Sequence, residues 1–234
     1  RMFNAVERLP IVIEMIVAET DEQRQAALDK LLPIQRADFR GLFETMAPRP
    51  VTIRLLDPPI HEFLPTERQL LDDLEQLKHL RDTVRGIDVM ASSALLLKAD
   101  AGAEIKQATR DMVSLDLVEQ AIATKELMLQ KVRALIEVNP MLGHRGVRLG
   151  ITFPEIYGMQ IRAILEAEAE CLAKGLEVHP QMMVPQVCTP QELKVVKRQM
   201  DAIKADVEEK SGQKLNCRFG TMIEVVRACM RADK

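Results

Sequence analysis

Apolar residues recur every three or four positions over the first part of the chain, which is the spacing of helices with one buried face. The sequence predicts a helix from Arg8 to Ala18, a second helix over residues 20–32 and a third helical stretch that ends near Met46. Thr20 opens the sequence TDEQ, which predicts a capping box at the start of the second helix. Pro33 is expected to interrupt or kink the run, because proline lacks a backbone N–H.

A long proline-free stretch over residues 66–138 has only two glycines, at positions 86 and 102. Leucines at 70, 74 and 77 lie at helical spacing, and charged residues fill the other positions. We predict two or three long helices here, with breaks near Arg85–Asp88 and Asp100–Gly102. The apolar stripe favours a core-facing or helix-pairing surface, and a partner-binding helix is the alternative.

Short apolar segments predict four strands, at 51–56, 147–151, 181–187 and 217–224. Helices are expected between them, one to about Lys174 and one to about Lys210, and capping boxes at Thr152/Glu155 and Thr189/Glu192 support their starts. Alternating strands and helices indicate an α/β fold with a parallel sheet or barrel. Because a closed barrel needs eight strands in roughly 200–250 residues, we predict a helix-rich, partial TIM barrel.

The composition narrows the class of protein. The 234 residues are 47% apolar and 29% charged, which is typical of soluble globular proteins, and a net charge of −3 gives no case for nucleic-acid binding. No run of 18 apolar residues and no signal peptide is visible, so no membrane is expected and we predict a cytoplasmic or organelle-matrix location. The four cysteines lack CxxC spacing and are interpreted as reduced. The ends look cut from a longer chain.

Arg54 lies within the apolar segment 51–56, where a charge is costly to bury without a partner. One interpretation is an ion pair with Asp57 or Glu62. The other is an arginine aimed at an anion from the end of a strand, where α/β enzymes place their sites. A glycine-rich loop farther along carries His144, Arg145 and Arg148, which suits either a phosphate or carboxylates.

Glu224 is the other candidate, because it falls among apolar neighbours near the end of the segment 217–224. A buried carboxylate needs a cation, a donor or a proton. Magnesium prefers one or two carboxylates plus ligand oxygens, so Glu224 is a candidate metal ligand. The alternative is an ion pair with Arg54, Arg148 or Arg227.

Four segments in the same order resemble the pyruvate phosphate dikinases, a family of phosphoenolpyruvate-utilising enzymes. The segments are RLLDPPIHEFLP at 54–65, NPMLGHRGVRLGITFPEIYGMQIRAI at 139–164, MMVPQV at 182–187 and GTMIEVVRA at 220–228. The resemblance implies the C-terminal phosphoenolpyruvate/pyruvate-binding domain, a TIM barrel. It assigns residues 1–50 to its N-terminal helices, 51–65 and 139–234 to part of the barrel, and 66–138 to an inserted helical segment.

The same resemblance implies an activity and roles for residues. The family interconverts ATP, phosphate and pyruvate with AMP, pyrophosphate and phosphoenolpyruvate through a phosphohistidine. Arg54 would contact the substrate phosphoryl group, and Glu224 would bind Mg²⁺ and substrate. Arg1 would correspond to an arginine that opens an R-T-E-H-M-F motif, although this chain continues Met2-Phe3 without the T-E-H.

Other family features are absent from this sequence: the second metal-binding aspartate, the glycine-flanked catalytic cysteine, the ATP-grasp domain and the phosphohistidine domain. We therefore expect no catalytic residue in this chain and no dikinase activity from it alone. Expected partners are pyruvate or phosphoenolpyruvate, the phosphohistidine domain of the full-length chain and a second copy in a homodimer. The alternatives are a synthase-type or enzyme I-type phosphotransferase, or a non-catalytic helical interaction module on a decayed barrel.

Overall fold

The computed structural model describes residues 5, 7–94, 107, 114–135 and 143–233. The chain divides into two compact units. The first comprises Arg1–Phe63 and Glu137–Lys234, and the second comprises Leu64–Ile136.

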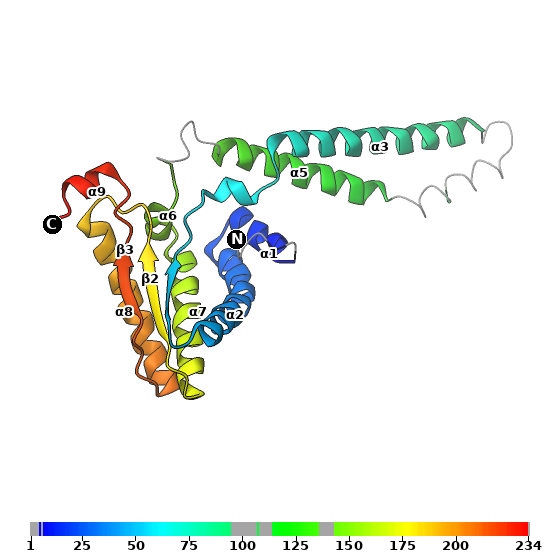
Figure 1. Ribbon diagram of the computed structural model, residues 1–234. Coiled ribbons are helices and arrows are strands. Elements are labelled where there is room, and N and C mark those ends of the chain that lie inside the picture. Colours follow the sequence, from blue (N-terminus) through cyan, green and yellow to red (C-terminus); the bar gives the residue numbers. More distant parts are fainter. Residues whose placement is uncertain (1–4, 6, 95–106, 108–113, 136–142, 234) are drawn as a thin grey trace. The chain divides into compact units, whose positions relative to one another are not determined.

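The first unit contains a three-stranded parallel sheet in the order β1-β2-β3 (Figure 1). The strands are β1 (Pro50–Arg54), β2 (His179–Val184) and β3 (Arg218–Thr221). Ile53 of β1 lies beside Met182 of β2, which in turn lies beside Phe219 of β3. Three of the four predicted strands are therefore confirmed, with shorter bounds, and the protein is helix-rich with a small parallel sheet.

The predicted strand at 147–151 is wrong, because these residues form the short helix α6 (Val147–Thr152). The segment is held at its start by Gly146, whose φ of 58° turns the chain, and by the N–H of Val147, which donates to Pro185 O at 3.1 Å. A five-residue apolar run fits a buried helical turn as well as a strand. Val147 and Leu149 are fully buried in this helix.

The longer helices of the first unit are α1 (Leu9–Val17), α2 (Asp21–Met46), α7 (Pro154–Ala173) and α8 (Pro190–Ser211). Shorter ones are η2 (Ile60–Phe63) and α9 (Val226–Met230). Helix α7 packs between α2 and α8 and contacts β2 (Figure 1). The hydrophobic core between helices and sheet includes Leu28, Phe39, Ile161 and Met182.

The predicted interruption at Pro33 is wrong, since α2 continues through it as a single helix. Proline removes one main-chain hydrogen bond, at a cost of about 3 kcal/mol in a helix interior. The buried face of α2 extends on both sides of Pro33 and includes Leu28, Leu31 and Phe39. Burying each such side chain contributes about 1.5–3 kcal/mol, so the packing outweighs the loss.

Helix starts were predicted well at two places and wrongly at a third. Thr20 caps α2 by accepting from the N–H of Gln23, and Thr189 forms the predicted capping box with Glu192 at the start of α8. Thr152 does not cap α7, because its hydroxyl donates to Arg148 O at 3.0 Å inside α6. Glu155 instead pairs with Arg24 of α2 at 2.8 Å.

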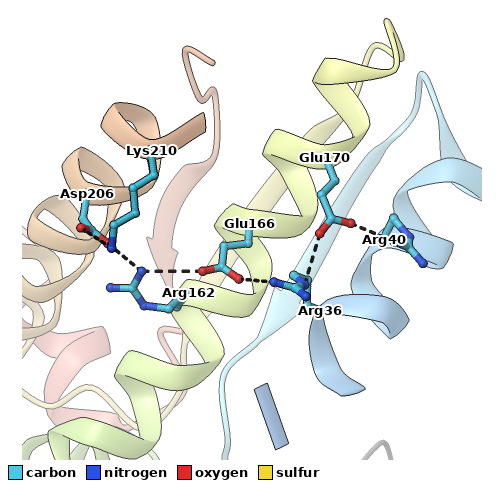
Figure 2. Close-up of polar contacts among 7 residues, drawn as sticks. All are labelled: Arg36, Arg40, Arg162, Glu166, Glu170, Asp206 and Lys210. Carbon is cyan, nitrogen blue, oxygen red and sulfur yellow. Dashed lines mark hydrogen bonds and ion pairs between the residues drawn. The ribbon is translucent and has the colours of Figure 1, made fainter. Parts of the chain in front are cut away.

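An ion-pair network joins the outer sides of α2, α7 and α8 (Figure 2). Charges alternate along it, and its members are, in order, Arg40, Glu170, Arg36, Glu166, Arg162, Asp206 and Lys210. Most of these side chains are partly exposed. The network therefore fastens the three helices together from the solvent side rather than from the core.

The second unit is a pair of helices, α3 (Glu67–Ala94) and α5 (Leu115–Leu135), that pack along each other. Ion pairs of Glu67 with Arg133 and of Arg85 with Glu119 show that the helices are antiparallel. The predicted break near Arg85–Asp88 is wrong, because α3 runs through it. The predicted break near Asp100–Gly102 lies outside the described residues.

The sequence predicted reduced cysteines and no membrane association. All four cysteines are free; Cys171 and Cys217 are buried, Cys188 is partly buried and Cys229 is exposed. Within the described ranges, none of the helices is long and apolar enough to cross a membrane.

Candidate functional site

The carboxyl ends of the three parallel strands meet at one edge of the sheet, with Arg54, Val184 and Thr221 as the last strand residues. Hydrogen bonds extend the pairing past these ends. The N–H of Leu55 donates to Met183 O at 3.0 Å, and the N–H of Met222 donates to Val184 O at 3.0 Å. The turns that follow the strands are therefore tied to one another, and this edge is the place where open parallel sheets usually bind ligands.

Asp57, just past β1, forms ion pairs with two arginines. Its Oδ2 lies 2.9 Å from Arg145 Nη2 and 3.4 Å from Arg54 Nη1. The Asp57 side chain is 7% exposed, that of Arg145 17% and that of Arg54 49%. The predicted ion pair of Arg54 with Asp57 is thus present. Two guanidinium groups share one carboxylate, which leaves a net positive charge with half of Arg54 open to solvent.

Asp57 also has an unused acceptor. Its Oδ1 is buried and has no hydrogen-bond partner among the residues that the structure describes. Arg145 makes a second contact, from Nε to Asp57 O at 3.1 Å. Arg145 is thus fixed by both the side chain and the main chain of Asp57, and Arg54 is the more adjustable cation of the two.

The residue between β1 and Asp57 is fixed by side chains of α7. The N–H of Leu56 donates to Gln160 Oε1 at 2.8 Å, and the hydroxyl of Tyr157 donates to Leu56 O at 3.1 Å. Both side chains are buried, and burial raises the pKa of Tyr157, so its hydroxyl keeps its proton. Sequence reasoning missed this pair. The signal was present, since Tyr157 is the single tyrosine and Gln160 is a polar residue in an apolar helix.

The loop before α6 supplies the other predicted basic residues. Arg148 Nη1 donates to Gly143 O at 2.7 Å, and Arg148 Nη2 lies 3.7 Å from the Sγ of Cys188. His144 Nε2 lies 3.0 Å from Thr152 Oγ1. Arg148 thus braces its own loop against the turn after β2. The residues before Gly143 in this predicted loop lie outside the described part of the chain.

Glu224 lies three residues beyond β3 and is exposed, so the prediction that it is buried in a strand is wrong. Its Oε1 accepts a hydrogen bond of 2.8 Å from the N–H of Gln186. Gln186 has a positive φ of 62°, which is uncommon for a residue other than glycine and marks a sharp turn after β2. Within the described ranges, Glu224 forms no ion pair with Arg54, Arg148 or Arg227, the partners that the sequence suggested.

Arg54 is the last residue of β1 and Glu224 lies beyond β3, the two outer strands of the sheet, and the two side chains do not contact each other. Two strand spacings separate their strands, about 10 Å. A small anionic molecule with a bound cation has the size to bridge that span. The third predicted residue, Arg1, lies outside the described residues.

The described side chains at this edge suit a metal ion that takes few ligands from the protein. The described residues include no cluster of three or more histidine, cysteine or acidic side chains. A site built from protein ligands alone, such as a structural zinc site, is therefore not present among them. Glu224 offers one exposed carboxylate with Oε2 free of the Gln186 bond. That fits Mg²⁺, which commonly takes one or two carboxylates and completes its shell with water and substrate oxygens.

A pocket of about 400 Å³ lies beside this edge, between the start of α8 and α9. Thr189, Thr221, Met222 and Arg227 contribute to its lining, whereas Arg54 and Glu224 do not. The predicted site residues thus occupy the open edge of the sheet, and the pocket is a neighbouring feature.

Comparison with known proteins places these features in context. The sequence model of the family described as "PEP-utilising enzyme, PEP-binding domain" matches residues 1–234. The chain is 43% identical over 235 residues to the pyruvate, phosphate dikinase of Entamoeba histolytica, covering 100% of this chain and 22% of that protein. It is 40% identical over 236 residues to the chloroplastic pyruvate, phosphate dikinase 1 of Arabidopsis thaliana, covering 100% of this chain and 20% of that protein. The chain thus spans about a fifth of the length of these relatives.

Proposed function

Because this chain belongs to the phosphoenolpyruvate-binding domain family of PEP-utilising enzymes, we propose that it forms part of the site where a pyruvate, phosphate dikinase holds pyruvate or phosphoenolpyruvate. The observation that carries the proposal is the carboxyl edge of the sheet, where a half-exposed arginine ends one outer strand and an exposed glutamate lies beyond the other. In the complete enzyme the reaction interconverts ATP, phosphate and pyruvate with AMP, pyrophosphate and phosphoenolpyruvate.

Arg54 is the proposed phosphoryl-binding residue. A guanidinium matches the geometry of a phosphoryl group and donates two parallel hydrogen bonds to it. Asp57 orients Arg54 through their ion pair. It does not neutralise the positive charge of the site, because its single negative charge is shared between Arg54 and Arg145. The half of Arg54 that is exposed is available to the substrate.

Glu224 is the proposed ligand of Mg²⁺ and contacts substrate through it. When bound there, Mg²⁺ offsets the negative charge that develops on the pyruvate oxygens. Glu224 contributes its Oε2, while the N–H of Gln186 holds Oε1 and so orients the carboxylate before a ligand arrives. Arg1 remains a proposed third contact to the substrate.

The wider assignments are proposals of the same kind. Sequential parallel strands joined by helices are the repeat of a (β/α) barrel, and we assign the sheet to part of one. In the whole protein, a phosphohistidine on another domain would deliver the phosphoryl group to this edge, in the cytoplasm or an organelle matrix. The chain by itself is expected to lack dikinase activity, which a coupled assay for phosphoenolpyruvate formation measures.

Binding to this edge is testable on the chain itself. The melting temperature is measured with MgCl₂ and oxalate, a planar dianion that resembles the enol form of pyruvate. A magnesium-dependent rise is expected, since a ligand that binds the folded state stabilises it. Arg54→Ala should abolish the rise. Arg218→Ala is the matched control. Arg218 is also an exposed arginine of the sheet, but it is the first residue of β3 and so lies at the amino ends of the strands, opposite the candidate site.

Each result has a clear meaning. A rise that is lost in Arg54→Ala and retained in Arg218→Ala supports the proposal. A rise of equal size in both variants would exclude Arg54 as the anion contact. No rise in the parent chain, together with a cooperative melt, would show that these residues do not form a binding site in this chain.

A further inference from the structure

The pocket of about 400 Å³ between the start of α8 and the short helix α9 lies beside the carboxyl edge of the sheet (Figure 1). Its volume is within the range of pockets that hold small organic molecules, about 300–1,000 Å³. The candidate site for pyruvate or phosphoenolpyruvate does not use it, because neither Arg54 nor Glu224 contributes to its lining. What the pocket can hold therefore depends on its own lining residues.

The apolar part of the lining is aliphatic. Val187 is only 5% exposed, Leu193 and Met222 are partly buried, and Ile223 is 55% exposed. None of the described lining residues is aromatic. Nucleobases are usually held by stacking on aromatic side chains, so this lining does not favour a nucleotide. It favours a ligand with an aliphatic body.

The same pocket carries positive charge. Arg227 and Arg231, four residues apart, both contribute to its lining and are both exposed. Among the described lining residues none is acidic, and within the described part of the chain neither arginine forms an ion pair. A guanidinium donates two parallel hydrogen bonds to a carboxylate. The pocket thus combines an aliphatic wall with an exposed cationic rim.

The acidic residues nearest to the pocket in the sequence are engaged elsewhere. Glu192 Oε2 accepts hydrogen bonds from the N–H of Cys188 at 2.7 Å and from the N–H of Thr189 at 2.8 Å. Glu224 Oε1 accepts from the N–H of Gln186 at 2.8 Å. Neither glutamate lines the pocket, whereas the amino end of α8 does and adds a positive partial charge.

We infer that this pocket binds a medium-chain aliphatic carboxylate, with its chain against the aliphatic wall and its carboxylate on Arg227 and Arg231. An uncharged chain would leave both guanidinium groups without a partner. Each buried methylene favours binding, so a chain of about eight carbons can bind here, whereas oxalate or pyruvate has too little apolar surface. The pocket is thus a ligand site distinct from the proposed substrate site.

Isothermal titration calorimetry with sodium octanoate and the 234-residue chain tests this inference. We expect one site with a dissociation constant of about 0.1 mM, a value within reach of a ligand of about ten non-hydrogen atoms. Octanamide is the matched neutral ligand, because it keeps the chain and the planar end group. It should bind at least about 10-fold more weakly, since it lacks the charge that strengthens hydrogen bonds to arginine.

Variants separate the two parts of the pocket. Arg227→Ala and Arg231→Ala should each weaken octanoate binding about 10-fold and change octanamide binding little. Arg198→Ala is the matched control, because Arg198 is an exposed arginine of α8 outside the lining, and it should bind octanoate like the parent. Ala228→Leu, which enlarges a partly buried lining residue, should weaken both ligands alike.

The exposed arginines can be replaced without loss of a core contact, and circular dichroism checks the fold of every variant. Octanoate binding that falls in both lining-arginine variants and persists in Arg198→Ala supports the inference. No binding at about 5 mM octanoate would overturn it, as would equal affinity for octanamide or an unchanged affinity in Arg227→Ala and Arg231→Ala. The rise in melting temperature with MgCl₂ and oxalate should persist in Arg231→Ala, so this inference and the proposed function can fail independently.

Discussion

The backbone N–H of Gln186 donates to Glu224 Oε1 at 2.8 Å, although the two residues follow different strands and lie 38 positions apart. One oxygen of the carboxylate is thus fixed by the main chain of a neighbouring turn. A fixed carboxylate loses little conformational freedom when it takes up a ligand. This contact explains how an exposed glutamate beyond the strand can be held in place.

Mutation can separate two roles of Glu224, which are to accept the hydrogen bond from Gln186 and to supply the negative charge that binds the metal ion. Glu224→Gln keeps a side-chain oxygen for the Gln186 N–H but removes the charge, so the melting temperature without ligand should change little. The rise with MgCl₂ and oxalate should disappear. Glu224→Ala should also lower the stability without ligand, by about 0.5–1.5 kcal/mol. If Glu224→Gln keeps the full ligand-dependent rise, Glu224 is not the metal ligand.

Asp57→Asn is predicted to destabilise the first unit. Arg145 is only 17% exposed and would lose its counter-charge, while Arg54 is half exposed and would lose less. We expect a loss of about 1–3 kcal/mol in the free energy of unfolding, measured with urea. Asp201→Asn, which removes an exposed partner of Lys197, should cost under about 0.5 kcal/mol. Similar losses in both variants would refute the bridging role of Asp57.

Gly146→Ala tests the close approach of the α6 loop to the turn after β2. Gly146 has φ 58° and ψ −133°, and a Cβ there would lie 2.8 Å from the Cβ of Gln186. Strain and overlap together should cost about 2–4 kcal/mol. Gly175 has φ 76° but open space around it, so Gly175→Ala isolates the backbone cost of about 1 kcal/mol. Thermal unfolding of both variants measures the difference.

Glu168 of α7 gives a pH-dependent prediction. The residue is 0% exposed, its Oε1 accepts from the N–H of Asn216 at 2.6 Å, and its Oε2 has no partner among the described residues. Burial raises the pKa of Glu168 from 4.5 to about 7, despite the backbone hydrogen bond and Lys204, which lower it; Glu208 raises it slightly. Cys217 faces the same group, and burial first and Glu168 second raise the pKa of its thiol to about 12.

The direction of the pH effect on stability follows from which state, folded or unfolded, keeps the proton of Glu168. Between pH 4.5 and about 7 the folded state keeps a proton that the unfolded chain releases, so stability from this group is full below pH 4.5 and falls until about pH 7. The total loss is about 3 kcal/mol. Glu168→Gln should remove this part of the pH dependence in urea unfolding at pH 5 and pH 8. Glu166→Gln, two residues earlier and partly exposed, should retain it.

The ion-pair network of Figure 2 predicts a salt-dependent coupling between α2 and α7. Arg36 and Glu166 lie 2.9 Å apart with exposed side-chain fractions of 38% and 23%. A double-mutant cycle with Arg36→Gln and Glu166→Gln should give a coupling of about 0.5–1 kcal/mol at low salt. In 1 M NaCl most of it should vanish, since the Debye length falls to about 3 Å. An unchanged coupling at high salt would indicate packing rather than charge.

Much of the first unit could be predicted from sequence because its signals are local. The capping box at Thr189 marks the start of α8 directly, and the prolines after Asp57 place the end of β1 to within a few residues. Position 147–151 could not be assigned locally, because the contact of Val147 with Pro185 decides it from 38 residues away. Gly86 suggested a break, but α3 runs through it as one helix, at a cost of about 1 kcal/mol for the glycine.

Part of the candidate site could also be predicted, because the signal for that part is local in the sequence. Arg54 and its partner Asp57 are three residues apart, so their pairing follows from local geometry. The environment of Glu224 depends on where β3 ends and on the amide of Gln186, which no local pattern encodes. Tyr157 and Gln160 act on Leu56 across about 100 positions, so their role requires the folded structure.

The two side-chain bonds to Leu56 have a consequence for exchange with solvent. The N–H of Leu56 lies just outside β1, where loop amides usually exchange their hydrogens quickly. Here its acceptor is the buried Gln160 Oε1, and its carbonyl is held by Tyr157. Deuterium can reach this amide only when α7 parts from the sheet. Leu56 should therefore exchange as slowly as the core of the first unit, and it reports from the sheet edge on the global opening of the fold.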